Sequence, residues 1–525
     1  MSGSFSESLF ADMTARKWAF YIFWYGVHAG VFIFGFFKQR MDGDLQLLNS
    51  LGYSVATSRG AGLVLAMDCC LLTLPMCRNL IRFARNLRIV NRILPFDQNI
   101  FFHKMAAYSL LFFTLVHVNA HYVNFFFVES KIFDKLPVRA WQIHYTTYAG
   151  VTGHIMLVLM FIMYSAAKTQ VRQKKFELFW YAHHLFVLFY VCLFLHYAGC
   201  FVKSNAGKCK PYGSNIYTVP CFCLYILERI VREYRARQST QLSKVIMHPG
   251  NTIELRIEKA SFAYKPGQYL FLNIPDIAYF QWHPFTISST PEEGFVSVHI
   301  RVVGDWTKKA AKLLGAYSTS DDSASTLDPK IRLPTIRIDG PFGAPAEDFY
   351  NYRSAVLVSA GIGVTPAASL LKSLWYRYYR KAPIGLRKVY FFWLARDKES
   401  FSWFQSLLST LEQSIPSSFL EIHVYLTGNL SVDDIQNLAL NDNSAYDALT
   451  ELRNKTHFGR PDWAKAFGNV RAAVEREVVD PKLGGGAVDV GVFYCGPSPL
   501  ASVLRKSCAG ASGGGVNFEF RKEHF

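Results

Sequence analysis

The pattern of apolar and polar residues divides the chain into two unlike halves. The first half carries six apolar runs, each approaching the roughly 20 residues that cross hydrocarbon as a helix. These runs occupy residues 19–37, 60–80, 100–121, 148–167, 178–198 and 217–231. The first run lacks a small-residue cleavage site, which favours a retained anchor. The pattern predicts six transmembrane helices.

The second half has the pattern of two soluble domains. After residue 240, short alternating strands such as 252–257 and 296–303 are separated by turn signals, which indicates a small β-barrel. From residue 353, strand and helix patterns alternate, as is typical of an α/β domain. We therefore predict a multi-domain membrane protein with three domains, at residues 1–235, 236–347 and 348–525.

Positive charge gathers in three short loops. The chain has 56 Lys and Arg against 39 Asp and Glu, a net charge of +17. The loops after the second, fourth and sixth runs carry Arg78, Arg82, Arg85, Arg88 and Arg92, then Lys168, Arg172, Lys174 and Lys175, then Arg229, Arg232, Arg235 and Arg237. Cationic loops remain cytoplasmic, so both termini are expected in the cytoplasm of an integral plasma-membrane or endomembrane protein. Anionic membrane lipid accounts for this charge, and nucleic acid is not needed as a partner.

Two apolar runs contain histidines at matched depths. His103 and His117 lie on the third run, and His183, His184 and His196 lie on the fifth. Imidazoles from two helices can fill both axial positions of a haem iron, so four could hold two haems. The 103–117 and 183–196 separations correspond to rises of roughly 21 and 20 Å.

Rotation on the fifth run is less favourable. His196 would lie about 140° around a straight helix from His183, and about 120° from His184. Helix geometry therefore leaves open whether His183 or His184 is the ligand, and either one requires local unwinding or tilt of the helix. With both axial positions filled, oxygen would be reduced at the haem edge.

The predicted barrel carries candidate flavin ligands. The segment His283-Pro284-Phe285-Thr286-Ile287-Ser288-Ser289 combines an aromatic ring, hydroxyl groups and a histidine, which could stack on a flavin and hydrogen-bond to it. His299-Ile300-Arg301 adds a guanidinium, a group well suited to pyrophosphate oxygens.

The α/β domain carries candidate nucleotide ligands. Gly361-Ile362-Gly363-Val364-Thr365-Pro366 stands between a strand and a helix, where backbone N–H groups bind phosphate, although the third glycine of the dinucleotide fingerprint is missing. Cys495-Gly496-Pro497 follows another strand. Arg396 and Arg460 favour the 2′-phosphate of NADPH, whereas Asp397 argues against it.

The combination of these motifs resembles the superoxide-forming NADPH oxidase family, of the phagocyte oxidase type. The resemblance rests on the paired histidines, HPFT with HIRVVGDWT, GIGVTP, FGRPDW, CGP and a terminal aromatic residue. It implies a ferric-reductase-like haem domain with two b-type haems, then a ferredoxin-reductase-like module that binds FAD on the barrel and NADPH on the last domain.

The resemblance also implies individual roles. It makes the haem ligands His103, His117, His183 and His196. The FAD-binding residues that it implies are His283, Pro284, Phe285, Thr286 and Arg301. Further candidates in the same motifs are Ile287, Ser288, Ser289, His299 and Thr307. It assigns NADPH to Gly361, Gly363, Thr365, Pro366, Arg396 and Cys495, with Arg460, Gly496 and Pro497 beside them. Phe525 would shield the flavin. Arg59 and His121 would lie beside the outer haem, where a cation stabilises superoxide, although Arg59 could instead cap the second span.

Electrons would then pass from cytosolic NADPH through FAD and the two haems to molecular oxygen outside. The alternatives are a ferric-chelate reductase of the same superfamily and a proton channel, which Arg82, Arg85 and Arg88 at every third position suggest. The sequence contains no EF-hand loop. The resemblance therefore implies cytosolic activators, a small GTPase and an adaptor, and allows a second protein in the membrane. Cys200 and Cys209 could form an outer disulfide.

Overall fold

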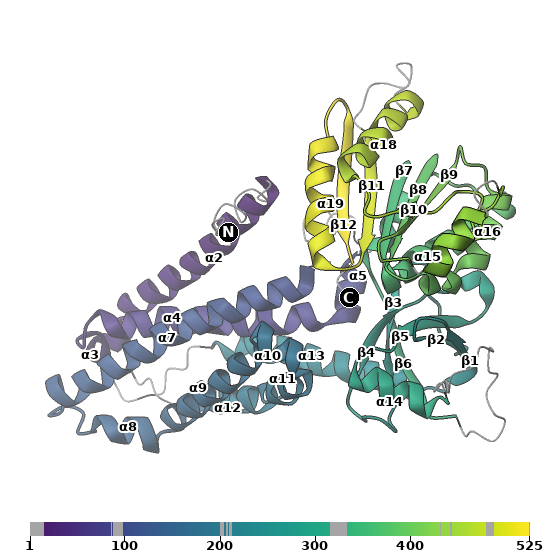
Figure 1. Ribbon diagram of the computed structural model, residues 1–525. Coiled ribbons are helices and arrows are strands. Elements are labelled where there is room, and N and C mark those ends of the chain that lie inside the picture. The colour runs from purple at the N-terminus through teal and green to yellow at the C-terminus, as the bar shows by residue number, and fades with distance from the viewer. Residues whose placement is uncertain are drawn as a thin grey trace. The chain divides into compact units, whose positions relative to one another are not determined.

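The computed structural model describes residues 15–85, 87, 98–199, 204–205, 208, 213–315, 333–430, 432–440, 444–478 and 488–523 (Figure 1). The chain forms two compact units, Met1–Arg229 and Ile230–Phe525. Cys200 and Cys209 lie outside the described residues, so their disulfide stays a prediction.

The first unit is helical. The first five predicted spans correspond to α2 (Ala15–Arg40), α4 (Tyr53–Thr73), α7 (Asn99–Lys131), α9 (Tyr148–Ala167) and the successive helices α11 (Phe176–His183) and α12 (Phe186–Ala198). Shorter helices between them are α3 (Gln46–Asn49), α5 (Arg78–Arg85), α8 (Ala140–Thr146) and α10 (Thr169–Lys174), and α13 (Asn215–Ala236) follows. Helices α2 and α4 approach closely at Gly60, where a Cβ would lie 2.7 Å from the carbonyl oxygen of Phe32.

Five helical segments among the described residues are long and apolar enough to cross a membrane: Phe20–Arg40, Tyr53–Met76, Asn99–Lys131, Tyr148–Ala167 and Phe176–Ala198. The sixth predicted span, 217–231, forms part of α13 but is not one of them. Its apolar run ends in a charged stretch that contains Glu228, Arg229 and Arg232, so a sixth span in α13 stays a prediction.

The second unit begins with two antiparallel sheets. One has the order β1-β2-β5 (Gln241–His248, Thr252–Glu258, Val296–Arg301), and the other has the order β4-β3-β6 (His283–Thr286, Tyr269–Asn273, Arg337–Phe342). Alternate residues such as Leu255, Leu270 and Val298 point into one apolar core, which helix α14 (Asp305–Leu313) also covers. This arrangement fits the predicted small barrel.

A parallel sheet of six strands follows, in the order β10-β9-β8-β7-β11-β12. The strands are β7 (Ser354–Ala360), β8 (Lys388–Ala395), β9 (Leu420–Leu426), β10 (His457–Phe458), β11 (Val488–Cys495) and β12 (Val516–Lys522). Because side chains alternate along a strand, Leu357 and Val358 enter different apolar clusters. Helices α15 (Thr365–Tyr379) and α16 (Gln405–Ser414) cover one face, and α18 (Trp463–Val478) and α19 (Ser498–Ala511) cover the other (Figure 1). Helix α17 (Val432–Leu440) follows β9.

The strand order creates a switch point beside β7. The chain enters the sheet at β7, adds β8, β9 and β10 on one side, and then returns to add β11 and β12 on the other. β7 and β11 are therefore neighbouring strands, and the loops that follow them run in opposite directions. This is where open α/β sheets bind ligands.

Candidate redox site

Two pairs of histidine rings face each other between helices of the first unit. The ring centroids of His103 and His183 are 6.0 Å apart, and those of His117 and His196 are 6.4 Å apart. Metal-bound imidazole nitrogens lie about 2 Å from the metal, so rings on opposite sides of one iron have centroids about 6 Å apart once the ring radius is added. Both pairs therefore have the spacing that a haem iron requires.

In three of the four histidines the Nδ1 atom is already engaged by protein, whereas that of His183 is buried without a hydrogen-bond partner. The Nδ1 atom of His103 lies 2.9 Å from the carbonyl oxygen of Leu72, and that of His117 lies 2.8 Å from the carbonyl oxygen of Ser58. The Nδ1 atom of His196 is 3.1 Å from the hydroxyl of Thr152. A carbonyl fixes the Nδ1–H tautomer and leaves the Nε2 lone pair for a metal. These contacts match the usual support of metal-binding histidines.

The fifth predicted span is interrupted beside its first histidine. Helix α11 ends at His183, α12 begins at Phe186, and the residues between them form a turn. This interruption supplies the unwinding that the histidine spacing requires. His183 faces His103, whereas His184 is exposed and bonds back to the carbonyl of Trp180 at 2.7 Å.

Arg59 and His121 lie near the second pair. The rings of His121 and His117 have centroids 4.5 Å apart. Arg59 follows Ser58, whose carbonyl binds His117, and it lies inside α4, so it does not cap the helix. Gly62 leaves room for the His117 ring, since a Cβ there would lie 3.3 Å from it.

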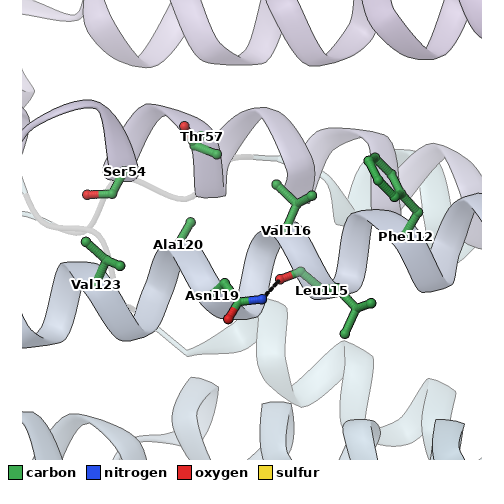
Figure 2. A pocket seen from close by; sticks show the side chains of 8 residues that line it. All are labelled: Ser54, Thr57, Phe112, Leu115, Val116, Asn119, Ala120 and Val123. Carbon is green, nitrogen blue, oxygen red and sulfur yellow. Dashed lines mark hydrogen bonds between the residues drawn. The ribbon is translucent and has the colours of Figure 1, made fainter.

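A pocket of about 490 Å³ lies elsewhere between α4 and α7 (Figure 2). It is lined by Ser54, Thr57, Phe112, Leu115, Val116, Asn119, Ala120 and Val123. The Asn119 amide donates to the carbonyl of Leu115 at 2.8 Å. None of the paired histidines lines this pocket, so it is not the space between the facing rings.

The predicted flavin segment meets the start of α14. The rings of His283 and Trp306 have centroids 4.0 Å apart, and Phe285 lies 6.1 Å from the same indole. The His283 Nε2 and Trp306 Nε1 atoms are buried without a hydrogen-bond partner. Burial lowers the pKa of His283 to about 4, so its ring is neutral at physiological pH. Buried polar atoms normally have a hydrogen-bond partner, so these two nitrogens fit a ligand with polar groups. The partly buried ring of Phe285 and the exposed Pro284 lie in the same segment, and the whole set fits a polar aromatic ligand such as flavin.

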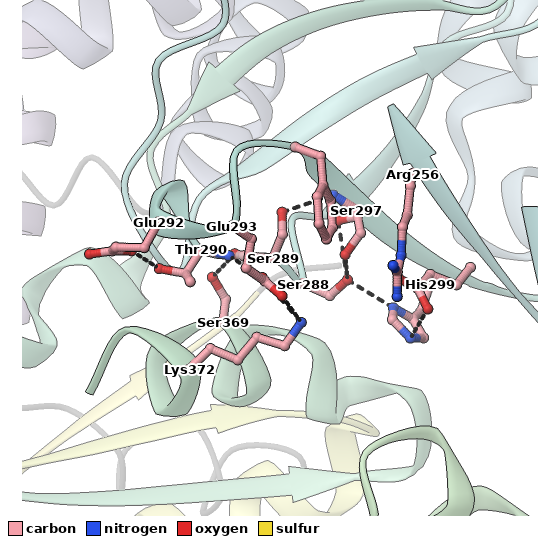
Figure 3. Close-up of polar contacts among 12 residues, drawn as sticks. Arg256, Ser288, Ser289, Thr290, Glu292, Glu293, Ser297, His299, Ser369 and Lys372 are labelled. Carbon is pink, nitrogen blue, oxygen red and sulfur yellow. Dashed lines mark hydrogen bonds and ion pairs between the residues drawn. The ribbon is translucent and has the colours of Figure 1, made fainter. Parts of the chain in front are cut away.

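The rest of the segment is tied into the protein. Ser288 Oγ lies 2.8 Å from both Ser297 Oγ and the Nδ1 atom of His299 (Figure 3). Ser289 accepts a hydrogen bond from the backbone of Ser297, and its carbonyl accepts one from Ser369 of α15. Thr286 and Ile287 are also buried. These side chains hold the segment in position.

Thr307 has a similar local role, because its hydroxyl accepts hydrogen bonds from the backbone N–H groups of Val303 and Gly304. The hydroxyl thereby fixes the turn before α14.

The two predicted nucleotide loops meet at the switch point. Gly361 has a φ of +56°, which favours glycine. A Cβ on Gly363 would lie 2.4 Å from the carbonyl oxygen of Cys495, so the loops touch through backbone. Thr365 and Pro366 are buried at the start of α15. Burial raises the pKa of the Cys495 thiol, which stays protonated beside Gly496 and the exposed Pro497.

The predicted cations differ in their surroundings. Arg396 follows β8, Arg460 follows β10, and both side chains are exposed. Arg301 forms an ion pair with Asp397 at 3.3 Å, and Ser400 also hydrogen-bonds to Asp397. The carboxylate that argued against a 2′-phosphate is therefore partly neutralised.

Three family profiles cover most of the chain. Residues 64–194 match "Ferric reductase like transmembrane component", residues 237–346 match "FAD-binding domain", and residues 352–509 match "Ferric reductase NAD binding domain".

Full-length relatives decide the family. A superoxide-generating NADPH oxidase heavy chain of Dictyostelium discoideum is 39% identical, over 90% of this chain and 90% of its own length. Mouse NADPH oxidase 1 is 35% identical, over 96% of this chain and 93% of its own. Human NADPH oxidase 3 is 33% identical, over 96% and 97%. The chain belongs to the superoxide-generating NADPH oxidase family. This oxidase is a membrane oxidoreductase with FAD- and NAD-binding domains.

The family assignment removes the rival interpretations. A ferric-chelate reductase would share the three profiles, but these relatives are named as oxidases. The arginines that suggested a voltage-sensing channel include Arg82 and Arg85 on α5, a helix of 8 residues. Arg88 lies outside the described residues, and α5 is not one of the five described segments that are long and apolar enough to cross a membrane.

The predicted role of Phe525 stays a prediction, because residues 524 and 525 of the oxidase lie outside those described. The last described residue, Glu523, accepts a hydrogen bond from the backbone of Ala346 and donates its own N–H to the carbonyl of Tyr494.

Sequence reasoning missed two features of the oxidase. Trp306 stands in one of the motifs and contacts His283 through its ring, a contact that the motif alone does not indicate. In the first unit, the Nε2 atom of His28 lies 2.9 Å from Asp68, and Ser109 donates to the same carboxylate. An acidic residue inside an apolar run was the available signal.

Proposed function

We propose that the oxidase carries electrons from NADPH through FAD and two b-type haems to molecular oxygen. Four histidines would hold the haems: His103 with His183, and His117 with His196. The main support is the spacing of 6.0 and 6.4 Å between the paired rings. Bound FAD converts a hydride into single electrons, which the haems relay across the membrane.

The histidine pairs also restrict where oxygen reacts. If two protein imidazoles hold each haem, as the pairs His103–His183 and His117–His196 would, oxygen would have to accept its electron without binding the iron. His121 lies on α7 with His117, and Arg59 lies on α4, next to Ser58, whose carbonyl is 2.8 Å from the His117 ring. We infer that the guanidinium stabilises the negative charge of superoxide, since a cation acts strongly in a site of low dielectric.

The reductase unit would bind both soluble cofactors. His283, Pro284, Phe285 and Thr286 would hold FAD, with Arg301 on its pyrophosphate. Gly361 and Gly363 would admit the phosphates of NADPH, while Arg396 and Arg460 read its 2′-phosphate. The Arg301–Asp397 ion pair supports this division, because it screens the carboxylate next to Arg396. Phe525 would cover the flavin until nicotinamide displaces it.

We infer domain boundaries at residues 235 and 347, with the basic loops and both termini cytoplasmic. This orientation requires an even number of crossings. The sixth predicted span, residues 217–231 of α13, would therefore have to supply the sixth crossing. Cytosolic activators, a small GTPase and an adaptor, would promote the domain closure that hydride transfer needs.

The test is superoxide release from purified protein supplied with NADPH, measured as cytochrome c reduction that superoxide dismutase suppresses. The proposal predicts such release, enhanced by cytosolic extract, and reduced haem bands in the spectrum. Reduction of a ferric chelate without superoxide would favour the reductase alternative. Absence of haem bands would exclude the electron path.

A further inference from the structure

A cluster of potential metal ligands lies on the first sheet of the second unit. Glu254 of β2 pairs directly with His299 of β5, and His248 ends β1 diagonally opposite Glu254. All three side chains leave the same face, because residues opposite or two apart on a sheet share a face. Their ligand atoms lie within 4.8 Å of one another, and among the described residues this is the one group of three His, Cys, Asp or Glu side chains that does so.

The carboxylate contacts both rings at their Nε2 atoms, and the rings themselves are stacked with centroids 5.2 Å apart. Oε2 of Glu254 is 3.2 Å from Nε2 of His248 and 3.8 Å from Nε2 of His299. Its other oxygen accepts a hydrogen bond from Arg256 at 2.8 Å. The Glu254 and His299 side chains are 7% and 2% exposed, whereas that of His248 is 16% exposed and gives access from solvent.

His299 has one ring nitrogen satisfied and one without a partner. Its Nδ1 atom lies 2.8 Å from Ser288 Oγ, and that hydroxyl can donate onward to the carbonyl of Ser297 at 3.1 Å (Figure 3). When that hydroxyl donates to the carbonyl, Nδ1 of His299 carries the proton, and Nε2 presents its lone pair on the side of Glu254. Nε2 is buried and makes no hydrogen bond. In this tautomer a lone pair and a carboxylate oxygen face each other, an arrangement that a cation between them would stabilise.

We propose that His248, Glu254 and His299 bind a divalent transition-metal ion, with Zn²⁺ the best match. Two imidazoles and one carboxylate are a usual zinc ligand set, completed by water. Tetrahedral bonds of about 2.0–2.1 Å put neighbouring ligand atoms about 3.3 Å apart, close to the 3.2 and 3.8 Å distances here. Hard cations such as Mg²⁺ prefer oxygen ligands and are disfavoured.

The site lies off the proposed electron path but is connected to the flavin segment. His299 holds Ser288, which follows the His283–Thr286 strand. The centroid of the His299 ring also lies 4.6 Å from that of Phe404. Phe404 precedes α16 of the nucleotide-binding region. A metal that fixes the His299 ring would therefore brace the barrel against that region and raise the thermal stability of the unit.

The test is equilibrium dialysis of radioactive Zn²⁺ against the full-length, haem- and FAD-loaded protein, prepared without a histidine tag and washed with chelator. We expect one zinc per chain and a higher melting temperature with zinc. His248→Asn and Glu254→Gln should each weaken zinc binding by more than about 100-fold. Replacing a residue that only hydrogen-bonds to a metal ligand already lowers metal affinity by about 10–100-fold, and losing a ligand should lower it further. Flavin content, measured for each variant, shows whether the barrel remains folded.

His423→Asn is the matched control. His423 lies 3.6 Å from Glu421, so it also forms a histidine–carboxylate pair, but that pair is not part of the three-ligand group. This variant should bind zinc normally. The proposal is overturned if the native protein binds no zinc at micromolar concentrations, or if binding survives unchanged in both folded ligand variants. Electron paramagnetic resonance of the Cu²⁺-loaded native protein should show coupling to two imidazole nitrogens, and coupling to none would also overturn it.

Discussion

Replacing Gly363 by alanine should disable the nucleotide site while leaving the haems and FAD in place. The new Cβ would lie 2.4 Å from the carbonyl oxygen and 2.8 Å from the carbonyl carbon of Cys495. Ordinary contacts begin about 1 Å further away, so the two loops must separate by roughly that amount. A displacement of 1 Å in a binding site can cost about 100-fold in rate, which is the loss we expect in flavin reduction by low concentrations of NADPH. The accompanying loss of stability should be about 1–3 kcal/mol.

The assay is anaerobic stopped-flow reduction of the bound flavin by NADPH, which does not require oxygen or electron transfer to haem. Gly468→Ala is the control, because Gly468 lies in α18 with nothing within 4 Å of the added Cβ. It should reduce normally and be stabilised by roughly 0.5–1 kcal/mol. If Gly363→Ala reduced its flavin within threefold of the native rate at low NADPH, the contact between the loops would not form the nucleotide site.

Three further outcomes follow from the described geometry. Arg396→Ala should raise the KM for NADPH more than that for NADH, since a guanidinium pairs bidentately with phosphate. Equal effects on the two cofactors would count against this role, and so would the same effect from Arg380→Ala, which removes an exposed arginine at the end of α15. Burial lowers the pKa of His283 to about 4 from 6.5, so the unfolded chain binds the proton first. Stability should therefore fall as the pH drops from 6.5 to 4, by at most about 1.4 kcal/mol per unit, and His283→Asn should flatten this slope in thermal melts. Micromolar calcium alone should not activate the purified chain, because its sequence has no EF-hand loop, and activation by calcium would refute this.

Much of the site could be predicted because its chemistry is local in sequence. The two glycines between β7 and α15 and the histidines on two apolar runs carry their meaning in spacing and residue type. The choice between His183 and His184 could not be made from spacing, because it depends on where the helix unwinds. The interruption between α11 and α12 turns His183 toward His103 and leaves His184 exposed.

Other features depend on contacts between distant parts of the chain. The pairing of His28 with Asp68 requires α2 to pack on α4, which no local pattern indicates. The cluster of His248, Glu254 and His299 depends on the register of three strands. The sixth predicted span lies in α13, where the apolar run continues directly into a charged stretch, so its apolar pattern alone does not define where it ends.

The central claim is that two pairs of histidines hold two haems between the flavin and oxygen. The most direct test is the ratio of haem to FAD in purified His117→Leu protein, measured by pyridine haemochrome and flavin fluorescence, with His184→Leu as the matched control. The native protein and the control should contain two haems per FAD. His117→Leu should contain one, still reduce its FAD with NADPH, and release no superoxide. Two haems in His117→Leu, or one in the native protein, would contradict the account.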